Sequence, residues 1–457
     1  MVKIIVVGGG PAGVSAALRA RRMGADVTLL EAAQLGGTAF NDGPAPLRAL
    51  ARAARLRADA ALFPTFGLKG EPPRVDFKAV IANANRISTY ANAVSGVTER
   101  VRETGVEVID GIGRARFIGP LAFEISDGRR FQGDRLVLAV GGEPRKLPIP
   151  GSELALSFGD LWKLEALPKR VTVVGGSATG CQLASILLDL GAQVDLIQAA
   201  DRLIPPSDAD ISLGLQAAFA DRGMSVLIGA RSESIARSNG RLTVNYRQGE
   251  ELQSLETDAV FLAVGWPANL SALDLDNAGV ETSRAPYIQV DEYLRTNVPE
   301  IFAVGDANGI SMLVQSALIQ GGVAAENAVM GAHRVYRAEA VATGSFTDPE
   351  YGSVGLTEAE ARTSHDCIIE VVRYTELPRA VIDAQTDGMC KLIVDKPTGA
   401  ILGAHVLGPY SAEVIQVAAA CMAARMEVTR VSEMEMAFPT FTEAIGMAAR
   451  RIVRRLN

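Results

Sequence analysis

The sequence is poor in the residues that build disulfide scaffolds and metal centres. It has four cysteines and three histidines among 457 residues. The cysteines are Cys181, Cys367, Cys390 and Cys421, and the histidines are His333, His365 and His405. No two cysteines have CxxC or CxxxxC spacing, and no histidine has ligand spacing around it. We therefore expect buried or incidental thiols, structural or solvent-exposed histidines, and no metal site.

The sequence also lacks an excess of positive charge and a long apolar run. Its formal net charge is -7, so electrostatics give no reason to expect a nucleic-acid partner. The longest apolar runs are too short to span a bilayer, and the opening MVKIIVVGGG enters a predicted strand within three residues, which leaves no room for a signal peptide. We expect a cytoplasmic protein with no membrane partner. The one basic cluster, at Arg450–Arg455, ends a predicted helix, where cations meet the negative end of the helix dipole.

What the chain does contain is a glycine-rich turn between predicted regular elements. Residues 3–7 form a predicted strand, GGGPAG forms a turn, a helix runs from about Ala12 to Met23, and DVTLLE forms a second strand that closes with Glu31. This order is typical of the unit that binds a dinucleotide in α/β proteins. The length gives room for about three domains.

Each position of this unit has a physical role toward a dinucleotide. Gly8 makes the tight turn, Gly10 lets the backbone approach a pyrophosphate, and Gly13 lets the helix pack on the strand. The helix N-terminus offers unpaired N–H groups and a positive dipole to the phosphates, and Glu31 accepts hydrogen bonds from ribose hydroxyls. The candidate cofactor-binding residues of this unit are Gly8, Gly10, Pro11, Ala12, Gly13 and Glu31.

The same pattern returns in residues 170–198, RVTVVGGSATGCQLASILLDLGAQVDLIQ. Ser177 stands where the middle glycine was, and its side chain crowds a pyrophosphate, although its hydroxyl is able to donate a hydrogen bond to it. Gln198 stands where the acid was, and no arginine at that place offers a partner for a 2′-phosphate. We expect a second dinucleotide here and leave its identity open. The candidate residues are Gly175, Ser177 and Ala178.

A third segment, TNVPEIFAVGDANG at residues 296–309, is a short apolar strand that runs into Gly305 and Asp306. An acid at a strand end beside a glycine binds sugar hydroxyls in some nucleotide sites and caps the following helix in other proteins. Taken alone, the segment leaves both interpretations open.

Taken in order, these segments resemble the pyridine nucleotide-disulfide oxidoreductases, which include dihydrolipoamide dehydrogenase, glutathione reductase and mercuric reductase. The likeness covers essentially the whole chain. LVLAVGGEP and FLAVGWPAN, with Gly141 and Gly265, match the crossovers between the two nucleotide domains, and residues 346–361 and 401–416 match the C-terminal dimerisation domain. The resemblance implies an α/β fold with two Rossmann-like dinucleotide-binding domains, for FAD and NAD(P), plus a C-terminal α+β dimerisation domain.

The resemblance also implies domain bounds and cofactor roles. It places an FAD-binding domain at 1–149 and 269–338, an NAD(P)-binding-like domain at 150–268, and the dimerisation domain at 339–457. Gly36, Gly37 and Thr38 would wrap the FAD pyrophosphate, and Asp306, beside Gly305, would bind the ribityl chain. NAD(P)H would be the hydride donor, and which of the two is used stays open. The partner subunit would complete each active site, so we expect a homodimer.

Two family motifs depart from their pattern in this chain. The redox-disulfide segment, close to GGTCxNxGCxPSK in the family, reads GGTAFNDGPAPLR here, with Ala39 and Pro44 at the cysteine positions. The C-terminal motif HPTxxE reads FPTFTE, so Phe438 replaces the catalytic histidine while Glu443 remains. Alanine and proline form no disulfide, and phenylalanine exchanges no proton. We therefore predict that the chain is not a disulfide reductase.

The hydride-transfer side departs as well. A lysine and a glutamate pair near flavin N5 in the family, and the matching positions hold Arg48 and Gln182. This change leaves a positive charge that favours an anionic flavin or substrate. The alternative for Arg48 is a surface or structural ion pair. Ala178 replaces the large residue that gates the nicotinamide pocket, which predicts a more open pocket.

These departures suggest three hypotheses for function. The leading one is a homodimeric FAD oxidoreductase that NAD(P)H reduces and that passes electrons directly to a non-disulfide acceptor, either quinone-like or another small molecule. Its pocket would be lined by Ala39, Phe40 and Pro44 and, from the partner chain, by Phe438 and Phe441. The alternatives are an FAD-dependent dehydrogenase or oxidase of its own organic substrate, with weak or no NAD(P) use, and a non-catalytic flavin-binding protein. The candidate catalytic residues are Arg48, Gln182, Phe438 and Glu443, and Arg48 and Phe438 are also candidates for contact with the cofactor.

Overall fold

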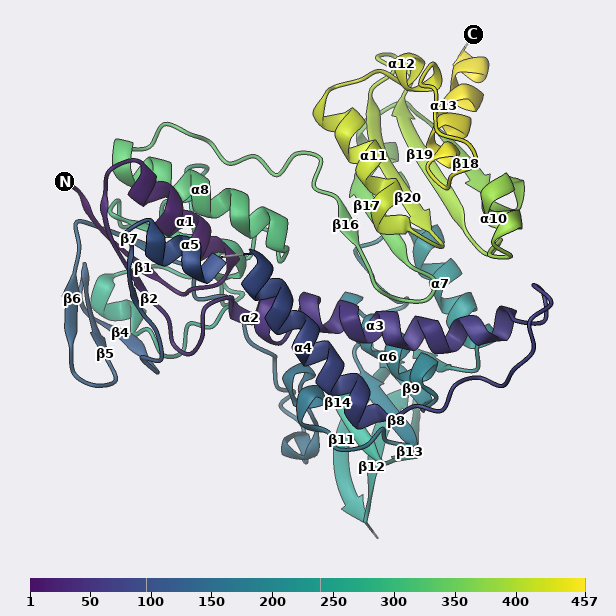
Figure 1. The fold of residues 1–457 in the computed structure, drawn as a ribbon, viewed down its shortest axis with the longest axis horizontal. Coiled ribbons are helices and arrows are strands. Elements are labelled where there is room, and N and C mark those ends of the chain that lie inside the picture. Colours follow the sequence, from purple (N-terminus) through teal and green to yellow (C-terminus); the bar gives the residue numbers. More distant parts are fainter. Residues whose placement is uncertain (96, 239, 457) are drawn as a thin grey trace. The chain divides into compact units, whose positions relative to one another are not determined.

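The computed structural model describes residues 1–95, 97–238 and 240–456. The chain divides into two compact units, each made of segments that lie far apart in the sequence (Figure 1). Unit 1 comprises Met1–Ala49, Ile81–Arg145 and Gly265–Ala338. Unit 2 comprises Leu50–Val80, Lys146–Val264 and Glu339–Asn457.

Unit 1 is built on a five-stranded parallel sheet with the order β15-β7-β1-β2-β3. Its strands are β1 (Lys3–Val7), β2 (Asp26–Leu30), β3 (Glu107–Ile109), β7 (Arg135–Leu138) and β15 (Ile301–Ala303). The central strands are almost continuous apolar runs because both faces of the sheet are covered. The predicted first strand, residues 3–7, is confirmed.

Two helices cover one face of this sheet, α1 (Pro11–Arg22) and α8 (Val314–Met330). Ile4 and Val6 of β1 point into the cluster that these helices form with the sheet. The helix expected from about residue 12 to residue 23 begins and ends one residue earlier, because Pro11 occupies its first position. The first 110 residues also form α2 (Gly37–Asn41) and α5 (Val97–Glu103) in unit 1, and α3 (Pro44–Ala58) and α4 (Phe77–Ser95), each of which has residues in both units.

A small antiparallel sheet covers the other face of the unit 1 sheet. It consists of β4 (Ala115–Gly119), β5 (Ala122–Ile125) and β6 (Arg130–Gln132). Phe117 and Phe123, whose ring centroids are 4.1 Å apart, pack in one apolar cluster with Ile5 and Val7 of β1. The parallel sheet is therefore buried between helices and a second sheet, as layered α/β domains require.

Unit 2 contains a second parallel sheet with the order β10-β9-β8-β14. Its strands are β8 (Arg170–Val174), β9 (Gln193–Gln198), β10 (Ser225–Ile228) and β14 (Ala259–Leu262), and its helices are α6 (Ala178–Leu190) and α7 (Ala209–Asp221). An antiparallel sheet of β11 (Ala230–Ser238), β12 (Arg241–Gln248) and β13 (Glu251–Thr257) follows. The second sheet repeats the strand order of the four neighbouring strands β3, β2, β1 and β7 in unit 1.

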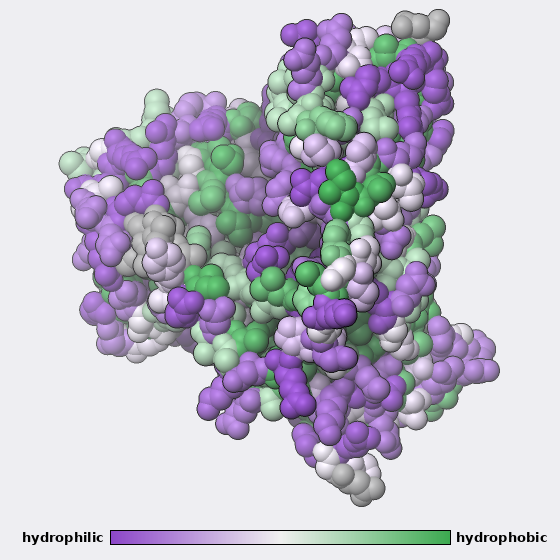
Figure 2. All heavy atoms as spheres, turned by 45° about the vertical axis from the view of Figure 1, so that its right-hand side comes forward, coloured by the Kyte–Doolittle hydropathy of each residue, from purple (hydrophilic) through white to green (hydrophobic). Residues whose placement is uncertain are grey.

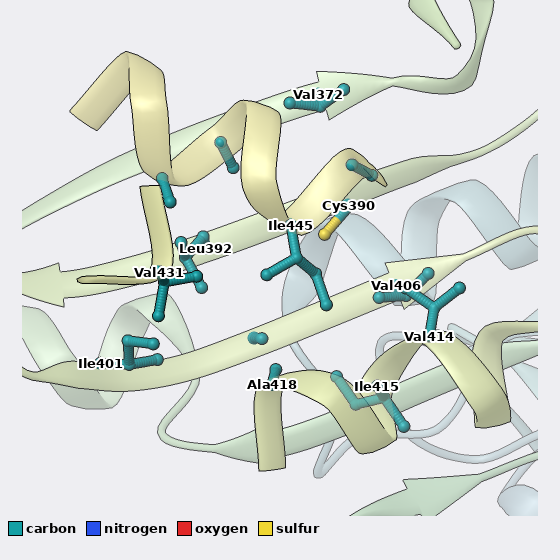
Figure 3. Packing of buried hydrophobic residues seen from close by; sticks show 14 of the residues in the cluster. Val372, Cys390, Leu392, Ile401, Val406, Val414, Ile415, Ala418, Val431 and Ile445 are labelled. Carbon is teal, nitrogen blue, oxygen red and sulfur yellow. The ribbon is translucent and has the colours of Figure 1, made fainter. Parts of the chain in front are cut away.

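The C-terminal part of unit 2 is an antiparallel sheet with helices. The sheet has the order β16-β17-β20-β19-β18. Its strands are β16 (Thr343–Gly344), β17 (Tyr351–Gly355), β18 (Cys367–Arg373), β19 (Met389–Asp395) and β20 (Ile401–Leu407), and the helices are α9 (Glu358–Ser364), α10 (Pro378–Ile382), α11 (Ser411–Ala423), α12 (Val428–Ser432) and α13 (Glu443–Leu456). Ile445 of α13, Ile415 of α11, and Leu392 and Val406 of the strands lie in one buried cluster (Figure 3).

The predicted fold class is confirmed. Two parallel sheets, each with a strand-turn-helix unit at its centre, precede an α+β domain at the C-terminus. Hydrophilic residues cover most of the face shown in Figure 2. In the part of the chain that the structure describes, no helix is long and apolar enough to cross a membrane.

Candidate functional site

The first glycine turn joins β1 to α1 through positions that exclude a side chain. Gly8 has a φ of +105°, and a Cβ on it would overlap the carbonyl oxygen of Ala139. A Cβ on Gly13 would overlap the carbonyl oxygen of Gly8, because the helix lies directly against the strand end. Both glycines therefore meet a geometric need that no other residue type satisfies.

The N-terminus of α1 is open. Its N-cap is Gly10, and no side chain caps the helix. A Cβ on Gly10 would meet only the Cα of Gly37 among the described residues outside the turn and helix, at 3.8 Å. Gly36 and Gly37 form a short glycine segment beside the turn. The N–H of Gly36 donates to the carbonyl of Gly9 at 2.9 Å and so connects this segment to the turn. Two side-chain-free stretches of backbone thus flank helix N–H groups that an anionic pyrophosphate is able to reach.

Glu31 follows β2 at the edge of this turn. Its side chain is buried, with Oε2 accepting from the N–H of Gly9 at 2.6 Å and Oε1 accepting from the N–H of Ala33 at 2.8 Å. Two backbone N–H groups hold the carboxylate in one orientation. The side chain therefore loses little conformational entropy when the carboxylate binds a ribose. The geometry fits the role expected for this acid.

Asp306 lies against the same helix terminus. It belongs to the short 3-10 helix Gly305–Ala307 after β15, and a Cβ on Gly305 would lie 3.3 Å from the Cβ of Ala12. Burial raises the pKa of Asp306, while a hydrogen bond from the Trp266 side chain acts in the opposite direction. The structure thus brings the third predicted segment to the first glycine turn, within unit 1.

The two predicted crossovers meet each other in unit 1. Gly142 and Ala268 form an antiparallel bridge, and the N–H of Asn269 donates to the carbonyl of Gly141 at 3.0 Å. Gly141 has a φ of +68° with open space around its Cβ position, and Gly265 has a φ of +129°. Both predicted glycines are therefore at positions where the backbone conformation favours glycine.

The second glycine turn, in unit 2, joins β8 to α6. Gly175 has a φ of +107°, and a Cβ on Gly180 would overlap the Gly175 carbonyl oxygen. Ser177 is the N-cap, but its side chain does not cap the helix, and both Ser177 and Ala178 are exposed. The amide oxygen of Gln198 accepts from the N–H of Gly176 at 3.1 Å. This helix N-terminus is therefore open to an anionic group as well.

The predicted pair of Arg48 and Gln182 comes from the two different units. Arg48 lies exposed on α3 in unit 1. Gln182 lies on α6, where its amide donates to the carbonyl of Ala178 at 3.1 Å and accepts from the N–H of Phe346 at 3.3 Å. Gln182 thus has partners within unit 2, and its proximity to Arg48 stays a prediction.

The segment with the altered redox motif is helical. Helix α2 carries Thr38 and Ala39, and α3 begins at Pro44, where proline suits the first helical position. The N–H of Gly43 donates to the carbonyl of Thr38 at 2.6 Å, and the hydroxyl of Ser88 donates to the carbonyl of Phe40. The backbone of the segment is therefore held by a hydrogen bond within it and by one from α4.

All four cysteines are buried free thiols, as expected. Burial raises the pKa of Cys181 on α6 to about 12, and that of Cys390 on β19 to about 12. His405 is also structural: its ring contacts the Ser353 hydroxyl and the Leu356 carbonyl, and burial lowers its pKa. Among the residues described, no group of three His, Cys, Asp or Glu side chains is arranged to hold a metal ion.

The C-terminal motif divides between surface and core. Phe438 is 70% exposed, and Glu443 begins α13 with Oε2 buried and without a hydrogen-bond partner in the described residues. Phe441 is only 5% exposed, and its ring centroid lies 5.2 Å from that of Tyr374 and 5.5 Å from that of Tyr410. The expectation that Phe441 lines a partner's flavin pocket is wrong, because the ring is packed in the core of its own domain.

One residue that the sequence did not point to supports the first turn. Gln320 of α8 is fully buried, and its Oε1 accepts from the N–H of Gly305 and from Nδ2 of Asn308, both at 2.8 Å. It therefore holds the loop that carries Asp306. A glutamine inside the helix sequence QSALIQGG carries no signal of this contact, because its partners lie on another element.

The chain was compared with known protein families. The family model described as "Pyridine nucleotide-disulphide oxidoreductase" matches residues 2–321, and the model of that family's dimerisation domain matches residues 341–449. These two matches cover the glycine turns, the loop of Asp306 and the C-terminal sheet.

Individual relatives agree with the family models. The chain is 31% identical to the dihydrolipoyl dehydrogenase of Zymomonas mobilis over 97% of this chain and 96% of the relative. It is 28% identical to the mercuric reductase of Lysinibacillus sphaericus over 98% of this chain and 82% of the relative. The crystal structure of LpdA from Mycobacterium tuberculosis superposes with a TM-score of 0.90 at 27% identity, over 99% of this chain and 100% of that one.

These relatives correct the functional prediction. The sequence predicted a non-disulfide acceptor, or alternatively a dehydrogenase, an oxidase or a non-catalytic flavoprotein, and in each case no disulfide reductase. The prediction is contradicted, because the relatives are dihydrolipoyl dehydrogenases and mercuric reductases. The prediction inferred an activity from three substituted positions, whereas the likeness to these enzymes extends over nearly the whole chain. The expected cofactors, FAD and a pyridine nucleotide, are those of the family.

Proposed function

The chain belongs to the pyridine nucleotide-disulphide oxidoreductase family, and on that basis we propose that it exchanges a hydride between a pyridine nucleotide and FAD. The observation that carries the proposal is the repetition of one open glycine turn, at Gly8–Gly13 in unit 1 and at Gly175–Gly180 in unit 2. An oxidoreductase that moves electrons between two dinucleotides needs two such sites.

The residues of unit 1 fit FAD. Gly10 and Gly37 leave a side-chain-free cradle at the α1 N-terminus, Glu31 presents a fixed carboxylate, and Gly305, which precedes Asp306 in the chain, lies against Ala12. We assign the pyrophosphate to the cradle, the adenosine ribose to Glu31 and the ribityl hydroxyls to Asp306. When bound, FAD supplies a ring that accepts a hydride.

The residues of unit 2 fit the second dinucleotide. Ser177 at the open N-terminus of α6 offers a hydroxyl and backbone N–H groups to a pyrophosphate. Gln198 takes the ribose position that Glu31 has in unit 1. Arg48 and Gln182 are proposed as the positioning residues of the hydride step, and their test is a KM-against-kcat separation in the variants Arg48→Ala and Gln182→Ala.

We further propose that Ala39 and Pro44 occupy the positions of the family's cysteine pair, and that Phe438 occupies that of its histidine. In support, residues 36–50 contain no cysteine, and the four thiols of the chain lie elsewhere and are buried. Anaerobic reduction with a pyridine nucleotide is then expected to leave the number of thiols counted after denaturation unchanged at four per chain. A rise in that number would reveal a redox disulfide and contradict this assignment.

We also propose that the protein is a homodimer. The match to the dimerisation-domain model supports this proposal, and light scattering that shows a monomer would overturn it. We further propose a cytoplasmic location and the domain bounds 1–149, 150–268, 269–338 and 339–457. Limited proteolysis with identification of the cleavage sites tests the bounds.

An anaerobic titration tests the hydride exchange. The FAD-loaded protein is titrated with NADH and, separately, with NADPH, and the flavin absorption band is expected to bleach with at least one of them. Ser177→Trp fills the mouth of the second turn, so this variant should keep its FAD and its bleaching by dithionite but lose bleaching by the pyridine nucleotide. Ser225→Trp, at the exposed start of β10, is the matched control and should behave like the parent.

Two results would contradict the proposal: a parent protein that neither nucleotide bleaches, or a Ser177→Trp variant that bleaches as fast as the parent. The names of the relatives indicate which partner substrates to assay next. Dihydrolipoamide with an oxidised pyridine nucleotide, and mercuric ion with a reduced one, are the first pairs, and turnover with either pair assigns the other half-reaction.

A further inference from the structure

The two glycine turns have the same backbone conformation although they lie in different units. Gly8 and Gly175 have φ values of 105° and 107°. The N-caps that follow, Gly10 and Ser177, have φ and ψ of -73° and -176° and of -79° and -176°. In both turns the second glycine donates its N–H to the side chain at the end of the second strand. The strand-end side chains are therefore comparable position for position.

These two side chains differ in charge. Glu31 accepts from the N–H of Gly9 at 2.6 Å, and Gln198 accepts from the N–H of Gly176 at 3.1 Å. Gln198 is 7% exposed, and its Nε2 also donates to the carbonyl of Arg202 at 3.1 Å, so the amide is held in one orientation. A neutral amide thus stands where a carboxylate would bind a ribose 2′-hydroxyl and repel a 2′-phosphate.

The loop after β9 does not restore a negative charge. It carries one exposed acid, Asp201, one cation, Arg202, and one buried acid, Asp208, whose charge is paired with that of Lys391. The guanidinium of Arg202 donates to the carbonyl of Pro205 at 2.7 Å, and its Nε has no hydrogen-bond partner in the described part of the chain. Asp195, further back on the strand, is paired with Arg170 at 2.9 Å. Neither a net negative charge nor a dedicated pair of arginines is therefore present at the strand end.

We propose that the second nucleotide site accepts NADH and NADPH with affinities within about tenfold of each other, which is about 1.4 kcal/mol, and that Gln198 is the residue that determines this. The inference rests on the proposed hydride exchange and names its nucleotide substrates. A neutral Gln198 forms no charge-assisted bond to the 2′-hydroxyl of NADH, unlike the carboxylate of Glu31 toward the ribose of FAD. It also does not repel the 2′-phosphate of NADPH, as a carboxylate at position 198 would.

Calorimetric titration of the FAD-loaded full chain with NAD⁺ and NADP⁺ tests the proposal without turnover. The parent protein should bind both, with a ratio of dissociation constants within about tenfold. Gln198→Glu should weaken NADP⁺ at least tenfold while NAD⁺ binds equally well or better. The same shift should appear with 2′,5′-ADP against 5′-AMP, because these fragments contain only the adenosine end.

Matched variants separate the local charge from general effects. Gln193→Glu adds the same charge at the exposed start of β9 and should leave the ratio unchanged. Ala199→Asp places a carboxylate on the exposed residue after Gln198, and it repeats the test in case the buried substitution lowers the FAD content. Both should retain the flavin content and melting temperature of the parent.

The outcomes distinguish the two proposals. A parent ratio above tenfold, or ratios that neither Gln198→Glu nor Ala199→Asp changes, would overturn the role of Gln198 and leave the hydride exchange intact. Absence of binding by both dinucleotides, and of bleaching by NADH and NADPH, would overturn both proposals together.

Discussion

The ammonium of Lys391 and the carboxylate of Asp208 form a buried ion pair, with Nζ 2.8 Å from Oδ1 and both side chains 2% exposed. The pair links β19 of the C-terminal sheet to the N-cap of α7 in the nucleotide-binding part of unit 2. Asp210 and Glu358 also contact the ammonium, at 2.7 and 2.8 Å. One lysine therefore holds together elements that the sequence places far apart.

Removal of this lysine should destabilise the protein strongly. In Lys391→Met, Asp208 stays buried without its cation, and such a change costs about 3–5 kcal/mol of unfolding free energy. Urea unfolding followed by circular dichroism measures the loss. Lys396→Met is the control, because its pair with Asp366 is exposed and is worth less than about 1 kcal/mol. Equal losses in the two variants would contradict a special role for the buried pair.

The contribution of this cluster should depend on pH in the acid range. Burial raises the pKa of Asp208, but hydrogen bonds from Lys391 and from the N–H of Glu358 outweigh it and hold the pKa below 3.8. A hydrogen bond from Lys391 likewise holds the pKa of Glu358 below 4.5. For carboxyls with lowered pKa values, the stabilisation is complete above the unfolded values and is lost as the pH falls through the folded ones.

The difference in unfolding free energy between the parent and Lys391→Met should therefore shrink as the pH falls from about 6 to about 3. On the alkaline side no loss is expected up to pH 10, because hydrogen bonds to three carboxylates outweigh burial and raise the pKa of Lys391 above 10.5. Urea unfolding of both proteins across this pH range measures the difference. A constant difference down to pH 3 would contradict the assignment of the charges.

The local parts of the nucleotide sites could be predicted from the sequence. The run KIIVV forms β1 at the predicted residues, and Gly8 and Gly13 occupy positions that exclude a Cβ. These features follow from short-range rules: a parallel strand covered on both faces is continuously apolar, and a tight strand-to-helix turn needs glycine. Glu31 was predictable for the same reason, since it directly follows its strand.

The rest depends on contacts that no sequence spacing encodes. The FPTFTE motif does not show that Phe441 faces the core while Phe438 faces solvent, because that depends on how the segment packs against Tyr374 and Tyr410. Gln320 reaches Gly305 from a different element. The functional prediction failed for a related reason: three substituted positions indicate which side chains are missing, but they do not identify the reaction that the remaining site performs.

A methyl group at the first turn should release FAD. Gly13→Ala places a Cβ where the carbonyl oxygen of Gly8 lies, so α1 must move away from β1 and the cradle opens. The ratio of flavin to protein after purification should fall to less than half of the parent value, and the melting temperature should fall with it. Gly119→Ala is the matched control, because its Cβ would point into open space. Full flavin content in Gly13→Ala would contradict the close approach of helix and strand.

The loop of Asp306 should lose its hold when its buried support is removed. In Gln320→Leu the N–H of Gly305 loses its acceptor, while the amide of Asn308 keeps only its bond to the carbonyl of Ala303. Leaving a buried donor unpaired costs about 1–3 kcal/mol. Because that loop presents Asp306 to the cofactor, the cost should appear as FAD affinity about tenfold weaker or more. Fluorescence titration of the apoprotein with FAD measures it. Ile319→Ala, an exposed neighbour on α8, should bind FAD like the parent, and a variant of Gln320 that also does so would show that the loop keeps its position without this glutamine.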